Sequence, residues 1–205
     1  MNIYKAARVA FGLEEESGVR GQIDPLRVGC VLAAANKRGN AAELVRVEIH
    51  RGRPLPNQDP IGHQAATLQA QAWKAAAPDI VAPQLRPLRL NPDTQKLEEK
   101  GVDVALAACA VEWALIEQVD HIVIFSHDTD LSSVVEVIAR LKGPGAVETA
   151  SWCSEDYRRR IPPIEGVTNH TLREKIFLAI EDRTHYGRAA RRRIEARALL
   201  TPSST

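Results

Sequence analysis

The amino-acid sequence predicts an α/β fold in which helices cover a parallel β-sheet. Three observations lead to this prediction. Helix-like and strand-like segments alternate along the chain, as they do in β-α-β units. Residues 121–126 form a largely apolar run of strand length, which is typical of a parallel strand buried on both faces. The length of 205 residues and the hydrophobic content of 44% suit one globular domain, with room for a short appendage.

The N-terminal part of the chain predicts two helices followed by a strand. The pattern of apolar and basic residues over Ile3–Phe11 suits an amphipathic helix. Asp24 is expected to cap a second helix over Pro25–Ala35, because proline is favoured at the first helical position. A turn is expected at residues 39–40, and the apolar–polar alternation over Leu44–Ile49 predicts a strand.

The middle of the chain predicts a loop, a helix and an extended segment. Residues 51–60 contain glycine and three prolines and are therefore expected to form a loop. A helix follows over residues 63–76. Residues 80–90 include Pro83 and Pro87, which are incompatible with a helix interior, so we expect an edge strand or irregular β segment there.

The next segments predict a β-α-β unit preceded by a long helix. Apolar residues recur at helical spacing from Gly101 to Gln118. The strand over residues 121–126 is followed by a helical pattern over 131–141, a break at 143–145 and a second strand over 146–152. The order strand, helix, strand indicates parallel pairing.

Overall composition leaves the partner open but constrains the compartment. A formal net charge of +1 indicates neither a nucleic-acid partner nor an acidic one. The three cysteines are far apart and lack CxxC spacing, which argues against a disulfide framework and a zinc site and predicts a reducing, cytoplasmic location. No segment has the pattern of a signal peptide or a membrane span.

Two carboxylates follow the predicted strand over residues 121–126. Ligands bind beyond the carboxyl ends of the strands in open parallel sheets, and Asp128 and Asp130 lie there. Two adjacent carboxylates repel each other unless a cation or proton intervenes, and Mg²⁺ or Mn²⁺ prefers such oxygen ligands. A bound ion of this kind activates water for phosphodiester cleavage. The sequence therefore predicts a metal-dependent nuclease site.

Purely structural roles for the same acids also fit the sequence. Asp128 can simply end the strand while Asp130 caps the following helix. Asp103 is expected in the first turn of the helix over 101–118, where any carboxylate interacts favourably with the helix dipole. Both interpretations are kept open at this stage.

Two segments together resemble the NYN domain family, a PIN-like family. These are the Lys-Gly-Val-Asp-Val start of residues 100–106 and the Ser-His-Asp-Thr-Asp end of residues 122–130. The resemblance implies a Rossmann-like three-layer parallel sheet and metal-dependent RNA cleavage with Mg²⁺ or Mn²⁺. It implies that three carboxylates are catalytic and bind the metal: Asp103, Asp128 and Asp130.

The resemblance also implies an incomplete N-terminus. Asn2-Ile3-Tyr4 is similar to the end of the family's opening motif, which would place the first strand and first catalytic Asp upstream of Met1. We therefore expect a sheet without its first central strand, with a gap between the strands near 44–49 and 121–126. Residues 1–155 are expected to form the NYN/PIN-like domain and residues 156–205 a basic helical extension.

Three positions depart from the family pattern. His127 replaces the usual Gly, Leu131 replaces a common Phe, and Cys109 stands where many members carry another Asp. We expect Cys109 to lie in the core rather than to bind metal. His127 is expected either to contact substrate or to fill a turn.

The C-terminal third supplies local positive charge. Arg158, Arg159 and Arg160 are consecutive, and five further arginines lie between residues 188 and 197. Arginine suits bidentate phosphate contacts, although a solvated helix face explains the second group equally well. The residues assigned here to substrate binding are Asn2, His127, Arg158, Arg191 and Arg192.

These observations predict a metal-dependent endoribonuclease that cleaves RNA with metal-activated water. The first alternative is a catalytically weak RNA-binding or protein-interaction module of the same fold. The second is a phosphatase of the haloacid dehalogenase type, because an apolar strand leading into Asp128-Thr129-Asp130 also resembles the nucleophile loop of that class. A homodimer fits domains of this class, and an antitoxin-type partner follows only by analogy with other PIN-like proteins.

Overall fold

A computed structural model describes residues 3–35 and 42–200. The predicted turn at residues 39–40 and the predicted substrate contact of Asn2 lie outside these described residues. The chain divides into two compact units. The first unit contains residues 1–42 and 103–183, and the second contains residues 43–102 and 184–205.

The first unit is built on a three-stranded parallel sheet. The strands are β5 (Ile122–Phe125), β6 (Val147–Trp152) and β7 (Thr168–Leu172), and β6 lies in the centre. Helix α5 (Ser132–Lys142) connects β5 to β6, which confirms the predicted β-α-β unit. Gly143 ends α5 with a φ of 91°, a left-handed conformation that favours glycine.

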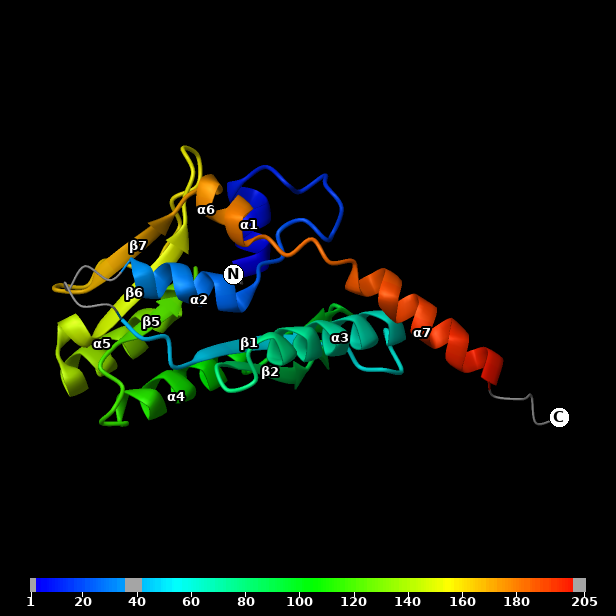
Figure 1. The fold of residues 1–205 in the computed structure, drawn as a ribbon, viewed down its shortest axis with the longest axis horizontal. Helices are drawn as coiled ribbons and strands as arrows, with labels where there is room; N and C mark the ends of the chain where they lie inside the picture. The colour runs from blue at the N-terminus through cyan, green and yellow to red at the C-terminus, as the bar shows by residue number, and fades with distance from the viewer. Residues whose placement is uncertain (1–2, 36–41, 201–205) are drawn as a thin grey trace. The chain divides into compact units, whose positions relative to one another are not determined.

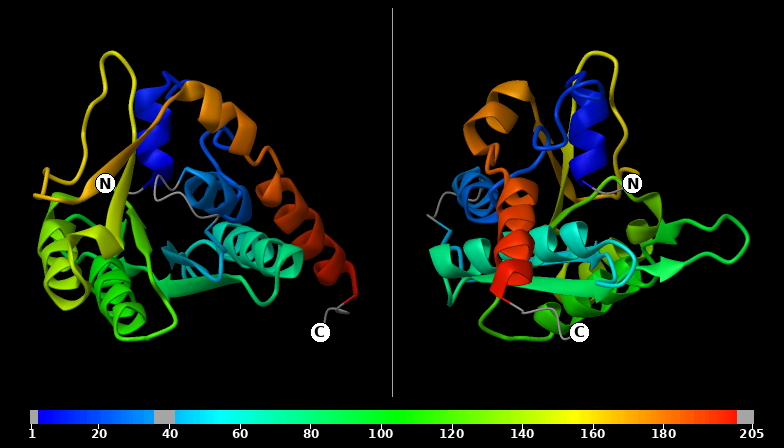
Figure 2. Two further views of the ribbon diagram at one scale, coloured as in Figure 1. Left: turned by 60° about the vertical axis from the view of Figure 1, so that its left-hand side comes forward. Right: turned by 90° about the vertical axis from the view of Figure 1, so that its right-hand side faces the viewer.

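Helices cover both faces of this sheet, as Figures 1 and 2 show. Helices α1 (Ile3–Ala10), α2 (Pro25–Ala34) and α6 (Glu174–Ile180) pack on one face in a core that includes Ala150 and Trp152 of β6. Helices α4 (Val102–Ala114) and α5 pack on the other face in a core that includes Ile124 of β5 and Val147 of β6. Because neighbouring strand residues point to opposite faces, one strand contributes to both cores. The three-layer prediction is confirmed for this unit.

The start of α2 shows that local sequence signals set helix ends as predicted. The Asp24 side chain accepts hydrogen bonds from the backbone N–H groups of Leu26 at 2.9 Å and Arg27 at 3.1 Å, and Pro25 opens the helix. Such a cap satisfies backbone donors that have no partner inside the helix.

Trp152 is the largest fully buried side chain in the described part of the chain. Its ring packs edge-on against Phe11, Phe125 and Phe177, with ring centroids 4.8–5.7 Å apart. The indole Nε1 donates a hydrogen bond to the backbone oxygen of Ile3 at 3.0 Å. One residue of β6 therefore joins helix α1, strand β5 and helix α6.

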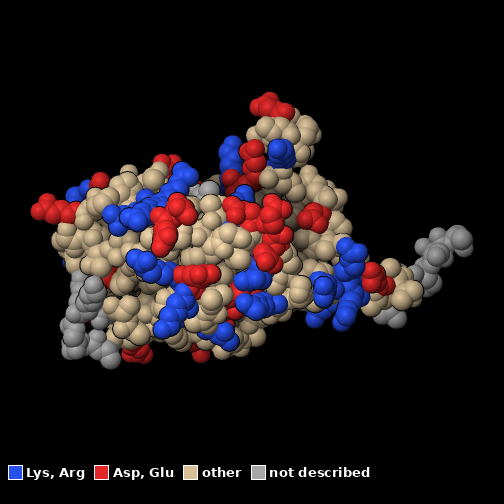
Figure 3. All heavy atoms as spheres, turned by 90° about the horizontal axis from the view of Figure 1, so that it is seen from above, with Lys and Arg blue, Asp and Glu red and all other residues tan. Residues whose placement is uncertain are grey.

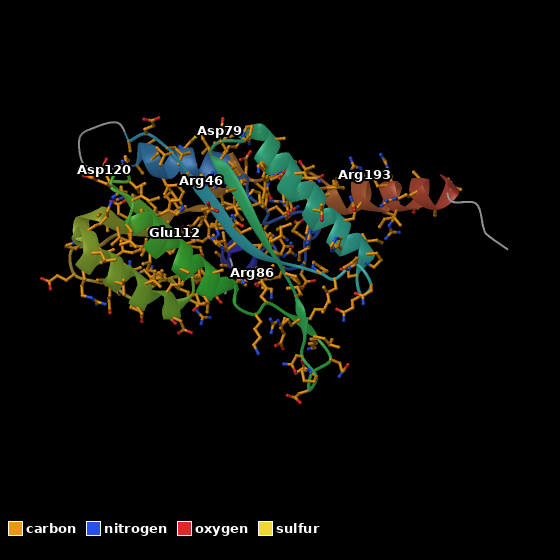
Figure 4. The ribbon with its side chains drawn as sticks, turned by 90° about the horizontal axis from the view of Figure 1, so that it is seen from below. Arg46, Asp79, Arg86, Glu112, Asp120 and Arg193 are labelled. Carbon is orange, nitrogen blue, oxygen red and sulfur yellow. The ribbon has the colours of Figure 1, made fainter. Side chains whose placement is uncertain are left out.

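The second unit is a β-α-β unit with two additions. Strands β1 (Val47–Arg53) and β2 (Val81–Pro87) pair in parallel, and helix α3 (Pro60–Ala76) connects them. Strands β3 (Arg89–Leu90) and β4 (Leu97–Glu98) form a short antiparallel hairpin, and helix α7 (Tyr186–Leu200) packs against α3. Arg46, just before β1, donates to the Glu48 carboxylate and to the backbone oxygen of Asp79 (Figure 4).

Several predicted boundaries were wrong. β1 begins three residues later than predicted and continues to Arg53, inside the predicted loop. Helix α3 begins at Pro60, because Asp59 caps it through the Gly62 N–H. Helix α4 ends at Ala114 rather than at Gln118.

The observed strands can be compared with the predicted C-terminal extension and with the predicted gap in the sheet. The predicted helical extension over residues 156–205 contains a strand, β7, as well as α6 and α7. Strands β1 and β2 form one parallel sheet and β5, β6 and β7 another, so the two strand regions expected to flank a gap do not pair with each other among the described residues. The division at residue 155 stays a prediction.

A buried ion-pair network attaches the N-terminal segment to the end of α6. The Glu181 side chain is only 1% exposed and accepts hydrogen bonds from Arg20 Nε at 2.6 Å and Arg183 Nε at 2.7 Å. Backbone bonds from Asp24 to Ile180 and from Asp182 to Gln22 flank this network, each at 2.9 Å. Burial raises the pKa of Glu181, but the hydrogen bonds and charges of the two arginines outweigh this effect, so the pKa of Glu181 lies below the usual value of a glutamate.

This lowered pKa predicts acid-sensitive stability. Because the folded-state pKa of Glu181 lies below the unfolded-state value, the unfolded chain binds the proton first and the contribution of this network is lost as the pH falls below about 4.5. We expect Glu181→Gln to lower the free energy of unfolding by about 1–3 kcal/mol at pH 7. The difference from the wild type should shrink towards pH 3.5, as measured by urea denaturation at both pH values. Glu174→Gln, an exposed position on α6, is the control, and an unchanged difference between the two pH values would contradict the assignment.

Candidate metal centre

The carboxyl end of β5 forms a tight turn that presents two carboxylates. Backbone pairing continues one residue beyond β5, where Ser126 N–H donates to the Ala150 oxygen at 3.3 Å. The chain then turns through a short 3₁₀ helix, η1 (Thr129–Leu131), whose Leu131 is 3% exposed in the core. This buried leucine anchors the turn directly after Asp130.

Asp128 is oriented by the turn in which it lies. Its backbone N–H donates to Ser126 Oγ at 3.1 Å, and its Oδ1 accepts a hydrogen bond from the Asp130 N–H at 3.1 Å. Asp128, and not Asp130, is therefore the capping residue at this point, which reverses the structural interpretation considered for the sequence. Asp128 is half-buried, whereas Asp130 is exposed.

Asp103 lies in the first turn of α4, as predicted, and its side chain is exposed. Leu106, Ala107 and Ala110 of the same helix pack in the core that also contains Leu131. Helix α4 and the turn after β5 are thus attached to one apolar cluster in the first unit.

The three carboxylates do not form a closed ligand set. In the described residues, 3–35 and 42–200, the carboxylate oxygens of Asp103, Asp128 and Asp130 do not all come within 4.8 Å of one another. Mg²⁺ usually retains several waters and takes only one or two protein carboxylates together with phosphate oxygens. The donor chemistry of the Asp128–Asp130 turn fits such an open site.

His127 is completely buried and both of its ring nitrogens are engaged. Nε2 accepts a hydrogen bond from the Trp152 N–H at 3.1 Å, and Nδ1 donates to the backbone oxygen of Arg159 at 2.7 Å. This pattern requires the neutral ring with its proton on Nδ1. Burial lowers the pKa of His127, and the hydrogen bond to Arg159 only partly opposes this effect. The predicted contact of this side chain with substrate is therefore not supported by its position.

The predicted phosphate-binding arginines are exposed but belong to different units. Arg158, with Arg159 and Arg160, lies on the loop between β6 and β7 in the first unit. Arg191 and Arg192 lie on α7 in the second unit. Basic side chains gather on this helix (Figure 3), and the neighbouring Arg193 is labelled in Figure 4. Each unit carries its own basic surface.

A cluster of one glutamate and two histidines at the other end of the sheet was missed by sequence reasoning. Glu148 of β6 contacts His170 of β7 through Oε2, which also lies 3.1 Å from Nε2 of His121. Burial raises the pKa of Glu148, but the hydrogen bonds from His170 and His121 outweigh this effect, so the pKa of Glu148 lies below the usual value of a glutamate. His121 precedes β5, at the opposite end of that strand from Asp128. Only the strand register brings these residues together.

The two acidic segments lie in a region that matches a known protein family. The NYN domain family model matches residues 30–146, which is more than half of the chain. The chain belongs to the NYN domain family. The matched region of this NYN domain includes Asp103, Asp128 and Asp130, so the resemblance based on the two acidic segments is confirmed. The loop that carries Arg158 and helix α7 lie beyond it.

Membership fixes the general class of the protein. NYN domains are PIN-like α/β domains of a nuclease-like family, and the parallel sheets described above agree with that fold. Searches of curated proteins and of solved structures gave no match. In the described residues, no helix is both long and apolar enough to cross a membrane.

Proposed function

We propose that this NYN domain is a metal-dependent endoribonuclease that hydrolyses RNA phosphodiesters with water activated by Mg²⁺ or Mn²⁺. The observation that carries the proposal is the turn after β5. It holds Asp128 and Asp130 at the carboxyl end of a buried parallel strand, where α/β sheets bind their ligands. Asp103, at the start of α4, is the third proposed metal ligand.

The two aspartates of the turn have different roles in the proposed site. The Asp130 N–H holds Oδ1 of Asp128, which restricts the orientation of that carboxylate before any ligand arrives. Asp130 is exposed and can receive a hydrated ion together with a substrate phosphate. The ion, when bound, lowers the pKa of its water and polarises the phosphoryl oxygen.

RNA binding is proposed for the exposed arginines. Arg158 follows β6, the strand next to β5, so its loop begins at the same edge of the sheet as the acidic turn. Guanidinium groups bind phosphate oxygens in a bidentate manner, and such contacts make RNA affinity depend on salt. Arg191 and Arg192 on α7 are proposed to contribute further phosphate contacts.

The proposal is tested by incubating the 205-residue chain with a labelled RNA pool and Mn²⁺. Internal cleavage that stops in EDTA and returns on addition of Mn²⁺ or Mg²⁺ is the expected result. A parallel preparation of Asp128→Asn excludes a contaminating nuclease, because contamination would not follow the substitution. Cleavage that persists in EDTA would contradict the metal mechanism. RNA binding without cleavage would favour the alternative of a catalytically weak RNA-binding module.

A further inference from the structure

We infer that His127 is a positioning residue that holds the arginine-bearing loop after β6 beside the acidic turn after β5. The inference rests on the proposed ribonuclease function. It assigns to His127 a role through its two hydrogen bonds rather than through contact with RNA.

The two segments joined by His127 leave the same edge of the sheet. β5 and β6 are parallel neighbours, with Phe125 opposite Ala150, so both chains emerge at their carboxyl ends. Asp128 is the next residue after His127, and the loop over residues 153–167, in yellow, extends beyond β6 (Figure 2). The acidic turn and the arginine-bearing loop thus begin close together.

The imidazole connects these segments at two points. On one side, Nε2 accepts from the Trp152 N–H at the last residue of β6. On the other side, Nδ1 donates to the Arg159 oxygen, in the middle of the three consecutive arginines. The Tyr157 ring packs edge-on against the imidazole, with centroids 5.5 Å apart. The loop is therefore held through its backbone.

Backbone attachment leaves the charged groups available to a ligand. Arg158, Arg159 and Arg160 all remain exposed although the Arg159 carbonyl is engaged. The exposed acids Glu155 and Asp156 precede the arginines in the loop, so the positive charge is confined to residues 158–160. RNA binding by this loop therefore depends on where this short stretch lies. The buried Ile161 attaches the loop just after the arginines, and the bond to Nδ1 fixes the backbone within the arginine stretch itself. Without that bond we expect the stretch to sample more positions, and ordering it on RNA would reduce the affinity.

Two substitutions separate the two bonds. The amide of an asparagine reaches the place of Nδ1, so His127→Asn keeps a donor for the Arg159 oxygen and loses the acceptor for the Trp152 N–H. The amide of a glutamine reaches the place of Nε2, so His127→Gln keeps the bond to Trp152 and loses the bond to the loop. Both variants lose one buried hydrogen bond and are expected to have similarly lowered melting temperatures.

The readouts are steady-state RNA cleavage with Mn²⁺ at two salt concentrations and limited digestion with trypsin. For His127→Gln we expect KM to rise about tenfold, kcat to stay within about twofold, and the salt dependence of KM to weaken as phosphate contacts are lost. Tryptic cleavage within residues 158–160 should accelerate in this variant. His127→Asn should retain the wild-type KM and the wild-type rate of tryptic cleavage.

The failures of the two proposals are distinguishable. If the wild type cleaves RNA and both variants have equal KM values, His127 has only a structural role and the inference is overturned. Equal rates of tryptic cleavage in the two variants would also overturn it, and this readout does not depend on activity. A wild-type chain that neither binds nor cleaves RNA would overturn the proposed function, and the role of His127 with it.

Discussion

Asp128→Asn is expected to reduce Mn²⁺-dependent RNA cleavage by roughly 10²–10³-fold without unfolding the protein. Metal-ion catalysis contributes several kcal/mol of transition-state stabilisation, and each 1.4 kcal/mol corresponds to about a tenfold change in rate. The substitution removes the negative charge that the proposed metal site needs. It retains an oxygen that can accept the hydrogen bond from the Asp130 N–H.

This substitution distinguishes the catalytic role of Asp128 from its structural role. Asparagine and aspartate are almost equally good helix caps, so the melting temperature should change by no more than about 3 °C. Asp128→Ala should lower both activity and stability, because it removes the cap as well as the charge. Asp120→Asn, at an exposed position before β5 and at the opposite end of that strand from Asp128, is the matched control for loss of one acid. Full activity in Asp128→Asn would show that this carboxylate serves only as a cap.

Trp152→Ala is expected to lower the free energy of unfolding by roughly 3–5 kcal/mol, which is the usual range for deletion of a buried large aromatic side chain. The residue is 0% exposed and contacts three other aromatic rings. The truncation would leave a cavity between strand β5, helix α6 and the segment that follows α1. Thermal or urea unfolding monitored by circular dichroism measures the change.

Trp152→Phe is the informative companion variant. It keeps an aromatic ring in the cluster but removes the hydrogen bond from Nε1 to the Ile3 oxygen, so we expect a loss of about 1–3 kcal/mol. A loss below about 1 kcal/mol for Trp152→Ala would contradict the central place of this residue in the core. A Phe variant as unstable as the Ala variant would show that the bond to Ile3 outweighs the packing of the ring.

Prediction from the sequence succeeded where neighbouring residues decide the structure. Asp24 and Pro25 indicated the start of α2, and the side-chain cap is present. The apolar run of β5 indicated a strand buried on both faces, and its residues contribute to both cores. Asp128 was located at the carboxyl end of that strand for the same reason. Its role as the capping residue became visible only in the structure.

Prediction failed where residues distant in the sequence decide the structure. β7 contains mostly polar residues, and it is a strand because it pairs along β6. The β1 boundary was misplaced because pairing with β2, up to Pro87, extends it into a glycine-containing segment. Periodicity describes how a segment buries its own side chains, and it carries no information on the strand beside it.

The sequence by itself determined the family, the β-α-β order around β5 and β6, and the position of Asp128 and Asp130 after a buried strand. All of these are indicated by short segments of consecutive residues, each of which has its own pattern of apolar and polar side chains. Tertiary structure alone decided that His127 is buried, that its ring bridges Trp152 and Arg159, and that Glu148 meets two histidines. The physical reason is that the partners of a buried polar group are set by strand register and loop path, which bring together residues far apart in the chain.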